Sequence, residues 1–320
     1  MAVPILKIRG VSKSFGSKQV LDNVDLEVNE GEIFGVIGPS GAGKTTLLEA
    51  MVGFVPLNSG DISYRAENSA VVNFISIKKD FESIKNQIGF STQTPSFYDK
   101  LTVKENLEYF AKLYNIRDEF IQQRISKILD LIELTGEEKT LAGELSGGMQ
   151  KRLDIACSLI NDPKILILDE PTADLDPLLR KHIWKLIKKI NSMGKTVIVS
   201  SHFLEEIDEL CTRIGLIHNK SIILSGTPTE MRNKYPYTQE IVLQLASRNY
   251  QKIALQLKGL PINKAIIRGD KMVIYTAKSD ILLKGLMNVI NKEREEVIEL
   301  TVQKPTLDEV FTAIVNKKGA

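Results

Sequence analysis

The chain runs from Ile33-Phe-Gly-Val-Ile37 directly into Gly38-Pro-Ser-Gly-Ala-Gly-Lys44-Thr45. The first five residues are continuously apolar, which is typical of a parallel strand covered on both faces. The next eight fit the pattern G-x-x-x-x-G-K-[ST], and a helix is predicted from about Lys44 to Val52. A strand, a glycine-rich loop and a helix in this order predict an α/β fold with a phosphate-binding loop at the end of a central strand.

The loop residues have the chemistry that phosphate binding requires. Glycine lets backbone N–H groups approach phosphates without a Cβ in the way, and the helix N-terminus adds partial positive charge. We expect Lys44 to neutralise the β- and γ-phosphates of ATP and Thr45 to offer its hydroxyl to Mg²⁺. The alternative is a glycine-rich turn with an incidental lysine. The residues predicted to contact ATP here are Gly38, Pro39, Ser40, Gly41, Ala42, Gly43, Lys44, Thr45 and Thr46.

A second apolar strand ends in two carboxylates, in the stretch Lys164-Ile-Leu-Ile-Leu-Asp169-Glu170. Ligands of parallel sheets bind at the carboxyl ends of the strands, so Asp169 is predicted to hold Mg²⁺ there. Glu170 is then predicted to orient or deprotonate the water that attacks the γ-phosphate. Alone, such a run more often marks a helix N-cap. Together with the phosphate-binding loop, it favours a catalytic site.

Strands alternate with helices along the first two thirds of the chain, which predicts a mostly parallel α/β sheet. Strands are expected within 3–37 and at 164–169, 195–200 and 213–218, and helices at 147–160, 177–191 and 203–210. Between them, residues 61–92 are expected to form short strands with a polar helix near 81–86. Two amphipathic helices are predicted within 102–134, the first opening with a capping box from Thr102 to Glu105.

The pattern changes after Pro228. Strands are predicted at 240–246 and 296–303, with a hairpin turning at Gly269-Asp270 between them, and helices near 248–257, 279–290 and 306–316. The order β-α-β-β-α-β predicts a small ferredoxin-like α+β domain. We therefore expect a first domain over 1–230 and an accessory domain over 231–320, with the boundary near 234–237.

Composition favours a soluble globular protein, because 43% of residues are hydrophobic and 26% are charged. Lys and Arg number 42 and Asp and Glu number 40, a near-balance that argues against a nucleic-acid binder. Cys157 and Cys211 have no metal or disulfide spacing and are expected to pack as apolar residues. No signal peptide is evident at the start, and no apolar run approaches the ~20 residues of a membrane-spanning helix. A role at a membrane would therefore require a partner that supplies the membrane part.

The class of nucleotide-binding protein follows from Leu145-Ser-Gly-Gly-Met-Gln-Lys-Arg152. This stretch resembles the signature of the ABC ATPases. Ser146, Gly147 and Gly148 would present a hydroxyl and bare N–H groups at a helix N-terminus, which is a second anion-binding site. A lone Leu-Ser-Gly-Gly is more often a flexible turn. Its position between the phosphate-binding loop and Asp169 makes the resemblance specific.

Other elements of the same family match residue by residue, and each has a plainer interpretation beside it. Gln93 resembles the glutamine that contacts Mg²⁺ and the attacking water, and otherwise is a solvated loop residue. Asp174 lies in a stretch that resembles the loop reaching across to the second subunit, and Asp176 also suits the N-cap before Pro177. His202 resembles the histidine that hydrogen-bonds the γ-phosphate. Phe15 resembles the aromatic residue that stacks on adenine, although the family usually has Tyr, and core packing is its alternative.

The resemblance covers residues 3–230 and implies the rest of the assignment. It implies an ATPase that binds Mg-ATP, with an antiparallel β subdomain and a helical subdomain over about 95–160 beside the P-loop core. It further implies a pair of ATPase subunits, expected to be identical, that clamp ATP between them. It also implies separate transmembrane permease subunits and a location on the cytoplasmic face of the cell membrane. The segment between Thr45 and Gln93 is longer than usual, and residues 64–80 are interpreted as an enlarged hairpin.

The tail Pro305-Thr-Leu-Asp-Glu-Val-Phe-Thr-Ala-Ile314 resembles the end of daunorubicin-resistance-type exporter ATPases. It favours an exporter, and a generic capping helix is the alternative. A soluble ABC ATPase acting on ribosomes is the competing function, but that class usually has two cassettes or a strongly basic linker. A P-loop kinase does not explain the stretch from Leu145 or His202. The transported molecule cannot be inferred.

Overall fold

The structure is a computed structural model that describes residues 3–66, 73–233, 239–257, 259–303, 306–307 and 309–312. The chain divides into two compact units, Met1–Thr227 and Pro228–Ala320. Each unit has its own hydrophobic core and is described here by itself. The boundary expected near 234–237 falls outside the described residues.

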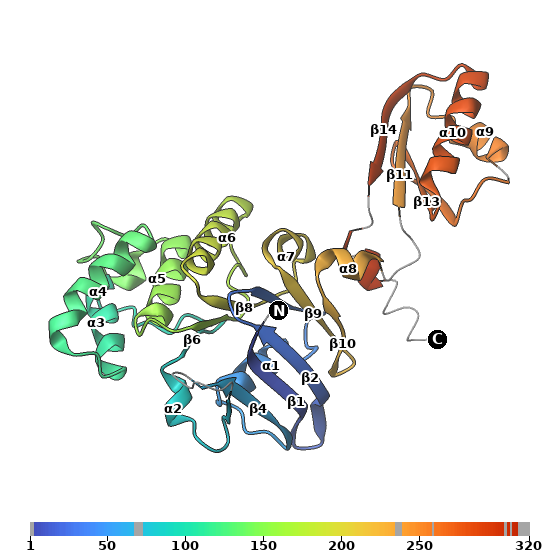
Figure 1. Cartoon of the computed structure of the whole chain (residues 1–320). Coiled ribbons are helices and arrows are strands. Elements are labelled where there is room, and N and C mark those ends of the chain that lie inside the picture. The colour runs from blue at the N-terminus through green and yellow to red at the C-terminus, as the bar shows by residue number, and fades with distance from the viewer. Residues whose placement is uncertain are drawn as a thin grey trace. The chain divides into compact units, whose positions relative to one another are not determined.

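The first unit is built on a six-stranded sheet with the strand order β10-β9-β3-β8-β7-β6 (Figure 1). β6, β7, β8, β3 and β9 are parallel, and β10 joins the edge antiparallel. The strands are β3 (Ile33–Ile37), β6 (Ile88–Ser91), β7 (Ile165–Leu168), β8 (Thr196–Ser201), β9 (Arg213–His218) and β10 (Ser221–Gly226). All residues of β3, β7 and β8 are buried, and the apolar sequences of β3 and β7 predict this.

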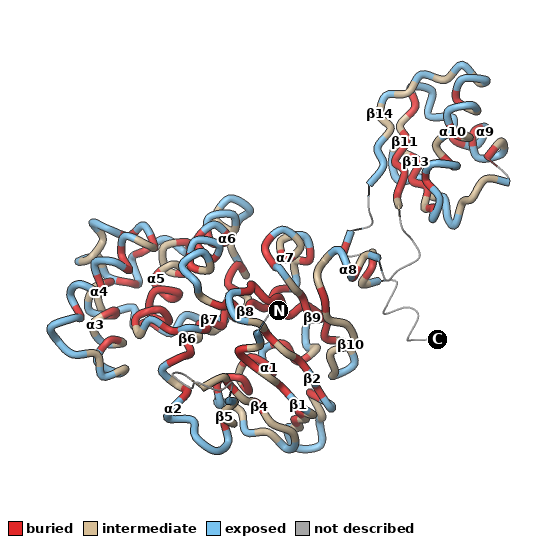
Figure 2. Tube along the Cα trace, in the orientation of Figure 1, coloured by how far each residue is buried: buried red, intermediate tan, exposed pale blue. Residues whose placement is uncertain are grey.

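Helices connect these strands, and a second sheet packs beside them. The helices are α1 (Lys44–Met51), α2 (Glu82–Lys85), α5 (Gly147–Leu159), α6 (Pro177–Ser192) and α7 (Leu204–Leu210). The antiparallel sheet has the order β2-β1-β4-β5 and comprises β1 (Pro4–Phe15), β2 (Lys18–Asn29), β4 (Ser59–Arg65) and β5 (Phe74–Ser76). Figure 2 shows buried residues running through both sheets, which share one core cluster.

β4 and β5 pair antiparallel, as expected for the enlarged hairpin that was predicted at residues 64–80. Buried Tyr64 donates a hydrogen bond from its hydroxyl to the backbone oxygen of Met51 at 2.6 Å, which fastens β4 to the end of α1. Residues 67–72, in the middle of the segment, lie outside the described residues.

The two amphipathic helices are α3 (Val103–Leu113) and α4 (Asp118–Leu131), followed by the short 3-10 helix η1 (Ala142–Glu144). The predicted capping box is present. The Thr102 side chain accepts from the backbone N–H of Glu105, and the Glu105 side chain accepts from the backbone N–H of Thr102. Both helices bury the apolar face that the sequence predicts, including Leu107, Ile121 and Ile125.

The second unit begins with α8 (Pro228–Asn233) and then follows the predicted β-α-β-β-α-β order. Its elements are β11 (Gln239–Leu245), α9 (Tyr250–Gln256), β12 (Lys264–Arg268), β13 (Lys271–Thr276), α10 (Ser279–Glu293) and β14 (Val297–Gln303). The sheet order is β12-β13-β11-β14 and every pairing is antiparallel, which is the ferredoxin-like topology. Of the predicted helix 306–316, the residues that the structure describes as helical are 307 and 309–312.

Three elements, β10, α8 and the short η1, were not expected from the sequence. β10 follows β9 through a turn at Asn219 and Lys220, whose φ angles are 47° and 71°. Turns that need positive φ at both positions normally show glycine, and neither residue here is glycine. Both cysteines are buried and free, as predicted. Among the described residues, no helix is both long and apolar enough to cross a bilayer.

Candidate functional site

The phosphate-binding loop connects β3 to α1, at the carboxyl end of a central strand. Its glycines are required by geometry. A Cβ on Gly38 would lie 2.4 Å from the carbonyl oxygen of Ile217 in the adjacent β9, and Gly41 and Gly43 have φ angles of 77° and 103°. Gly43 is the N-cap of α1. The loop therefore presents bare backbone N–H groups at a helix N-terminus, which suits an anion.

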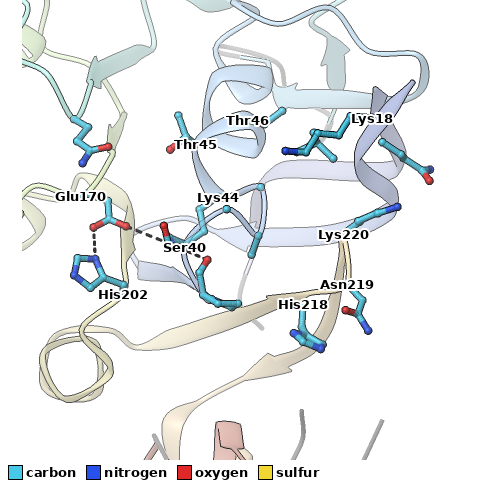
Figure 3. A pocket seen from close by; sticks show the side chains of 17 residues that line it. Lys18, Ser40, Lys44, Thr45, Thr46, Glu170, His202, His218, Asn219 and Lys220 are labelled. Carbon is cyan, nitrogen blue, oxygen red and sulfur yellow. Dashed lines mark hydrogen bonds and ion pairs between the residues drawn. The ribbon is translucent and has the colours of Figure 1, made fainter. Parts of the chain in front are cut away.

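Lys44 is the first residue of α1 and its side chain is buried. Its ammonium donates hydrogen bonds to the backbone oxygens of Gly38 at 3.0 Å and Pro39 at 3.3 Å. It also lies 3.3 Å from Oε1 of Glu170 (Figure 3). The carbonyl oxygens of the loop thus hold the Lys44 ammonium at the loop.

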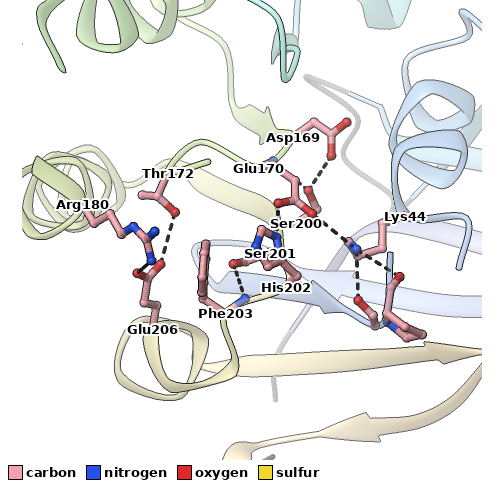
Figure 4. Close-up of polar contacts among 12 residues, drawn as sticks. Lys44, Asp169, Glu170, Thr172, Arg180, Ser200, Ser201, His202, Phe203 and Glu206 are labelled. Atoms are coloured by element: carbon pink, nitrogen blue, oxygen red, sulfur yellow. Dashed lines mark hydrogen bonds and ion pairs between the residues drawn. The ribbon is translucent and has the colours of Figure 1, made fainter. Parts of the chain in front are cut away.

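Asp169 and Glu170 follow β7 directly, and Ser200 on the neighbouring β8 ties them together (Figure 4). The Ser200 hydroxyl donates to Oδ1 of Asp169 at 2.5 Å and accepts from the backbone N–H of Glu170 at 2.8 Å. Glu170 has a φ of 47°, a left-handed conformation that is costly for a residue with a side chain. One buried hydroxyl therefore fixes both the first carboxylate and the strained residue that carries the second.

Glu170 lies between two nitrogen groups. One carboxylate oxygen faces Lys44, and the other, Oε2, lies 2.5 Å from Nδ1 of His202 (Figure 4). His202 follows β8 and is half-exposed, whereas the Glu170 side chain is largely buried, with 12% of its surface accessible. Each carboxylate oxygen of Glu170 therefore contacts one nitrogen group, and Glu170 also lines the cavity over the phosphate-binding loop.

A cavity of about 830 Å³ lies over the phosphate-binding loop (Figure 3). Its lining includes most of the predicted site residues: Pro39, Ser40, Gly41, Ala42, Gly43, Lys44, Thr45, Thr46, Gln93, Glu170 and His202. Sequence reasoning missed six further lining residues, Lys18, Gln19, Val20, His218, Asn219 and Lys220. Lys18 and Lys220 add positive charge to the cavity. The sequence did not predict their place there, because they lie on separate hairpins that are far apart in the chain.

Seven other predicted residues do not line this cavity, and Gly38 and Asp169, whose contacts are given above, are two of them. Phe15 is half-exposed, and the ammonium of Lys13 lies 4.7 Å from its ring centre, so Phe15 is not a core residue. Asp174 is exposed with a φ of 62°, near Asp176, which caps α6 through the N–H groups of Leu178 and Leu179 as predicted.

The remaining three residues form the start of α5. Ser146 is its N-cap and accepts from the backbone N–H of Met149 at 3.4 Å. Ser146 and Gly147 are exposed, and a Cβ on Gly148 would lie 2.9 Å from the Leu179 side chain. This second anion-type helix end therefore points to solvent and not into the cavity of its own chain.

Comparison with known proteins identifies the family. A family model described as ABC transporter matches residues 21–173. The linearmycin resistance ATP-binding protein of Bacillus subtilis is 30% identical over 98% of this chain and 99% of its own length. The chain belongs to the ABC transporter family. Within it, the chain is an ATP-binding subunit and therefore a nucleotide-binding ATPase.

Other relatives agree in type. A daunorubicin resistance ATP-binding protein of Streptomyces coeruleorubidus is 30% identical over 97% of this chain and 96% of its own length, and a Nod factor export ATP-binding protein of Sinorhizobium fredii is 35% identical over 98% and 86%. A nucleotide-free ATP-binding cassette of an ABC transporter is 28% identical and covers 72% of this chain and 94% of its own, with a TM-score of 0.63. The resemblance stated from the motifs is confirmed, as is the fold class.

Proposed function

We propose that this ABC ATPase subunit hydrolyses Mg-ATP between two copies of itself and drives an exporter whose membrane part is formed by separate permease subunits. The single observation that carries the catalytic part is the position of Glu170, held between Lys44 and His202 at the cavity over the phosphate-binding loop. Relatives named for drug resistance and Nod factor export support the export direction. The location follows as the cytoplasmic face of the membrane, where the permease would hold the subunit.

The chain's own groups suit the hydrolytic step. Glu170 accepts a proton from water on its cavity side, while His202 holds the opposite carboxylate oxygen in place. Lys44 has backbone carbonyl partners that keep its ammonium over the loop, where it neutralises phosphate charge. Gly38, Gly41 and Gly43 keep the loop open enough for backbone N–H groups to contact phosphate oxygens.

Mg²⁺ fits the residues present. Thr45 lines the cavity, Asp169 is buried with one oxygen held by Ser200, and Gln93 lines the same cavity. Among the described residues there is no cluster of three or more His, Cys, Asp or Glu that would hold a metal alone. The protein would thus supply a hydroxyl, an amide and a carboxylate, and nucleotide phosphates with water would complete the shell. The metal would add charge neutralisation between the β- and γ-phosphates.

The exposed residues of the predicted site support a second copy. Ser146, Gly147 and Asp174 face solvent and line no part of their own chain's cavity. A two-fold arrangement in which each copy places Ser146 over the other's loop would use them twice, once for each nucleotide. The γ-phosphate attracts the Ser146 end in this arrangement, and its removal by hydrolysis weakens the contact.

Substitutions at Ser146 separate this role from simple helix capping. Ser146→Asp and Ser146→Asn both retain an N-cap acceptor for the Met149 N–H, so the melting temperature should stay within a few degrees. Aspartate places a negative charge where the partner's γ-phosphate would approach, and asparagine does not. We expect Ser146→Asp to lower kcat by about 100-fold or more and Ser146→Asn by about 10-fold or less, while ATP affinity of the monomer changes less than ~3-fold. Equal rates for the two variants would contradict the role of Ser146 at the phosphate.

A further inference from the structure

Helix α5 contains two buried charges that the roles above do not use. Lys151 and Asp154 have 7% and 1% of their surfaces exposed, one and two turns into the helix that Ser146 opens. Burying an ion pair is costly and is offset only where further hydrogen bonds satisfy both groups. Burial lowers the pKa of Lys151, and Asp154 counteracts this effect. The hydrogen-bond partners of Lys151 and Asp154 therefore indicate which part of the structure the pair stabilises.

Among the described residues, the other hydrogen-bond partners of the pair lie at the last residue of β6 and on the loop that follows it. Asp154 accepts from the Ser91 hydroxyl through Oδ2 and from the backbone N–H of Ser96 through Oδ1 at 2.8 Å. The Lys151 ammonium donates to the backbone oxygen of Thr92 at 3.1 Å and lies 3.7 Å from Oδ2 of Asp154. The pair thus connects α5 to residues 91–96 at three points.

The three points enclose Gln93. Ser91 and Thr92 precede it and Ser96 follows it by three residues, while Gln93 itself is exposed and lines the cavity. The buried contacts therefore fix the backbone on both sides of an otherwise solvent-facing side chain. α5 packs against β6 and β7 (Figure 1), so the same helix that starts at Ser146 also fixes the loop.

We propose that Lys151 and Asp154 are positioning residues that hold Gln93 at the cavity and connect it to the Ser146 end of α5. Contact of a partner subunit with Ser146 would then change the position of Gln93, because both are attached to the same helix, α5. The inference rests on the proposed function, because it assigns Gln93 a role in hydrolysis. It adds that this role depends on a charge pair that is not part of the cavity lining.

The test replaces the pair by apolar residues of similar size in the full chain. Lys151→Met with Asp154→Leu removes both charges together, so no unpaired charge stays buried. We expect kcat to fall at least ~10-fold, with ATP affinity within ~3-fold and the melting temperature within a few degrees of the original. The matched control, Lys195→Met with Asp162→Asn, removes a Lys–Asp pair with a 2.6 Å contact that does not touch the loop, and should leave kcat unchanged.

A cycle with Gln93→Ala distinguishes positioning from a structural effect. If the pair acts through Gln93, its removal should change kcat less than ~3-fold once Gln93 is already alanine. The same ~10-fold loss in both backgrounds would overturn the inference and leave the proposed function standing. If Gln93→Ala alone leaves kcat unchanged, the role given to Gln93 fails and the inference falls with it.

A second variant covers the case in which the double substitution does not fold. Ser91→Ala removes one loop-side donor and leaves the Lys151–Asp154 pair in place. We expect a loss in kcat of about 3- to 10-fold that again disappears in the Gln93→Ala background. An unchanged kcat in Ser91→Ala protein that also keeps its melting temperature would count against the inference.

Discussion

Glu170→Gln protein is expected to bind ATP normally and to hydrolyse it at least ~10²-fold more slowly. Glutamine has the shape of glutamate and can still contact His202 and Lys44, so the site should keep its form. It cannot accept the proton of the attacking water, and general-base catalysis typically contributes ~10²–10⁴ in rate. Binding without turnover should also make the ATP-dependent pair of subunits long-lived.

The measurement compares steady-state phosphate release with ATP affinity and with mass in solution, with and without Mg-ATP. Glu205→Gln is the matched control, because Glu205 is an exposed carboxylate on α7, outside the cavity lining. Turnover of Glu170→Gln within a few-fold of the original would show that Glu170 is not the catalytic carboxylate.

Lys44→Ala is expected to weaken ATP binding by about 100-fold or more. The ammonium is buried and fixed by two backbone carbonyls, so it is placed to meet phosphate without being reordered. A hydrogen bond to a charged group contributes about 1.5–3 kcal/mol. If Lys44 donates two such bonds to phosphate oxygens, their loss corresponds to a factor of ~10² or more in affinity.

Calorimetric titration with ATP and Mg²⁺ tests this expectation, beside the same titration of Lys188→Ala, which removes an exposed lysine of α6. A melting curve shows whether the protein is folded, since the substitution removes the ammonium that lies 3.3 Å from the Glu170 carboxylate. An unaltered ATP affinity in folded Lys44→Ala protein would refute the phosphate-binding role.

The sequence predicted those parts of the site that depend on short local patterns. The loop from Gly38 to Thr45 must turn tightly beside Ile217 and enter a helix, and only a few residue types permit this geometry. The buried β7 is wholly apolar and ends at Leu168, and two carboxylates follow it directly. Local steric and burial requirements of this kind leave a readable pattern.

Contacts between distant segments left no such pattern. Ser200 bridges Asp169 and Glu170 from another strand. Nothing in the sequence of β8 predicts this role for a serine. No feature of the sequence predicts that Lys151 is buried, yet it is, and its ammonium donates to the backbone oxygen of Thr92 beside Gln93. Such roles depend on which strands become neighbours, which the residue order alone does not fix.

The roles of Ser146 and Asp174 are of a third kind. Both residues are exposed in the single chain, and the proposed function gives them partners in a second copy. Neither the sequence nor the structure of one copy contains that contact. Their assignment to the ATP site stays a prediction until two copies are studied together.

Mixing two inactive variants tests the composite site most directly. Lys44→Ala protein keeps an intact Ser146 end, and Ser146→Asp protein keeps an intact phosphate-binding loop. In an equal mixture, half of randomly formed pairs contain one of each and therefore one complete site of two.

We predict that ATPase activity of the mixture will reach about a quarter of the original activity at equal total protein, although each variant alone is nearly inactive. Activity of the mixture no higher than the average of the two separate variants would contradict the account, because a chain that completes its own site gains nothing from a partner.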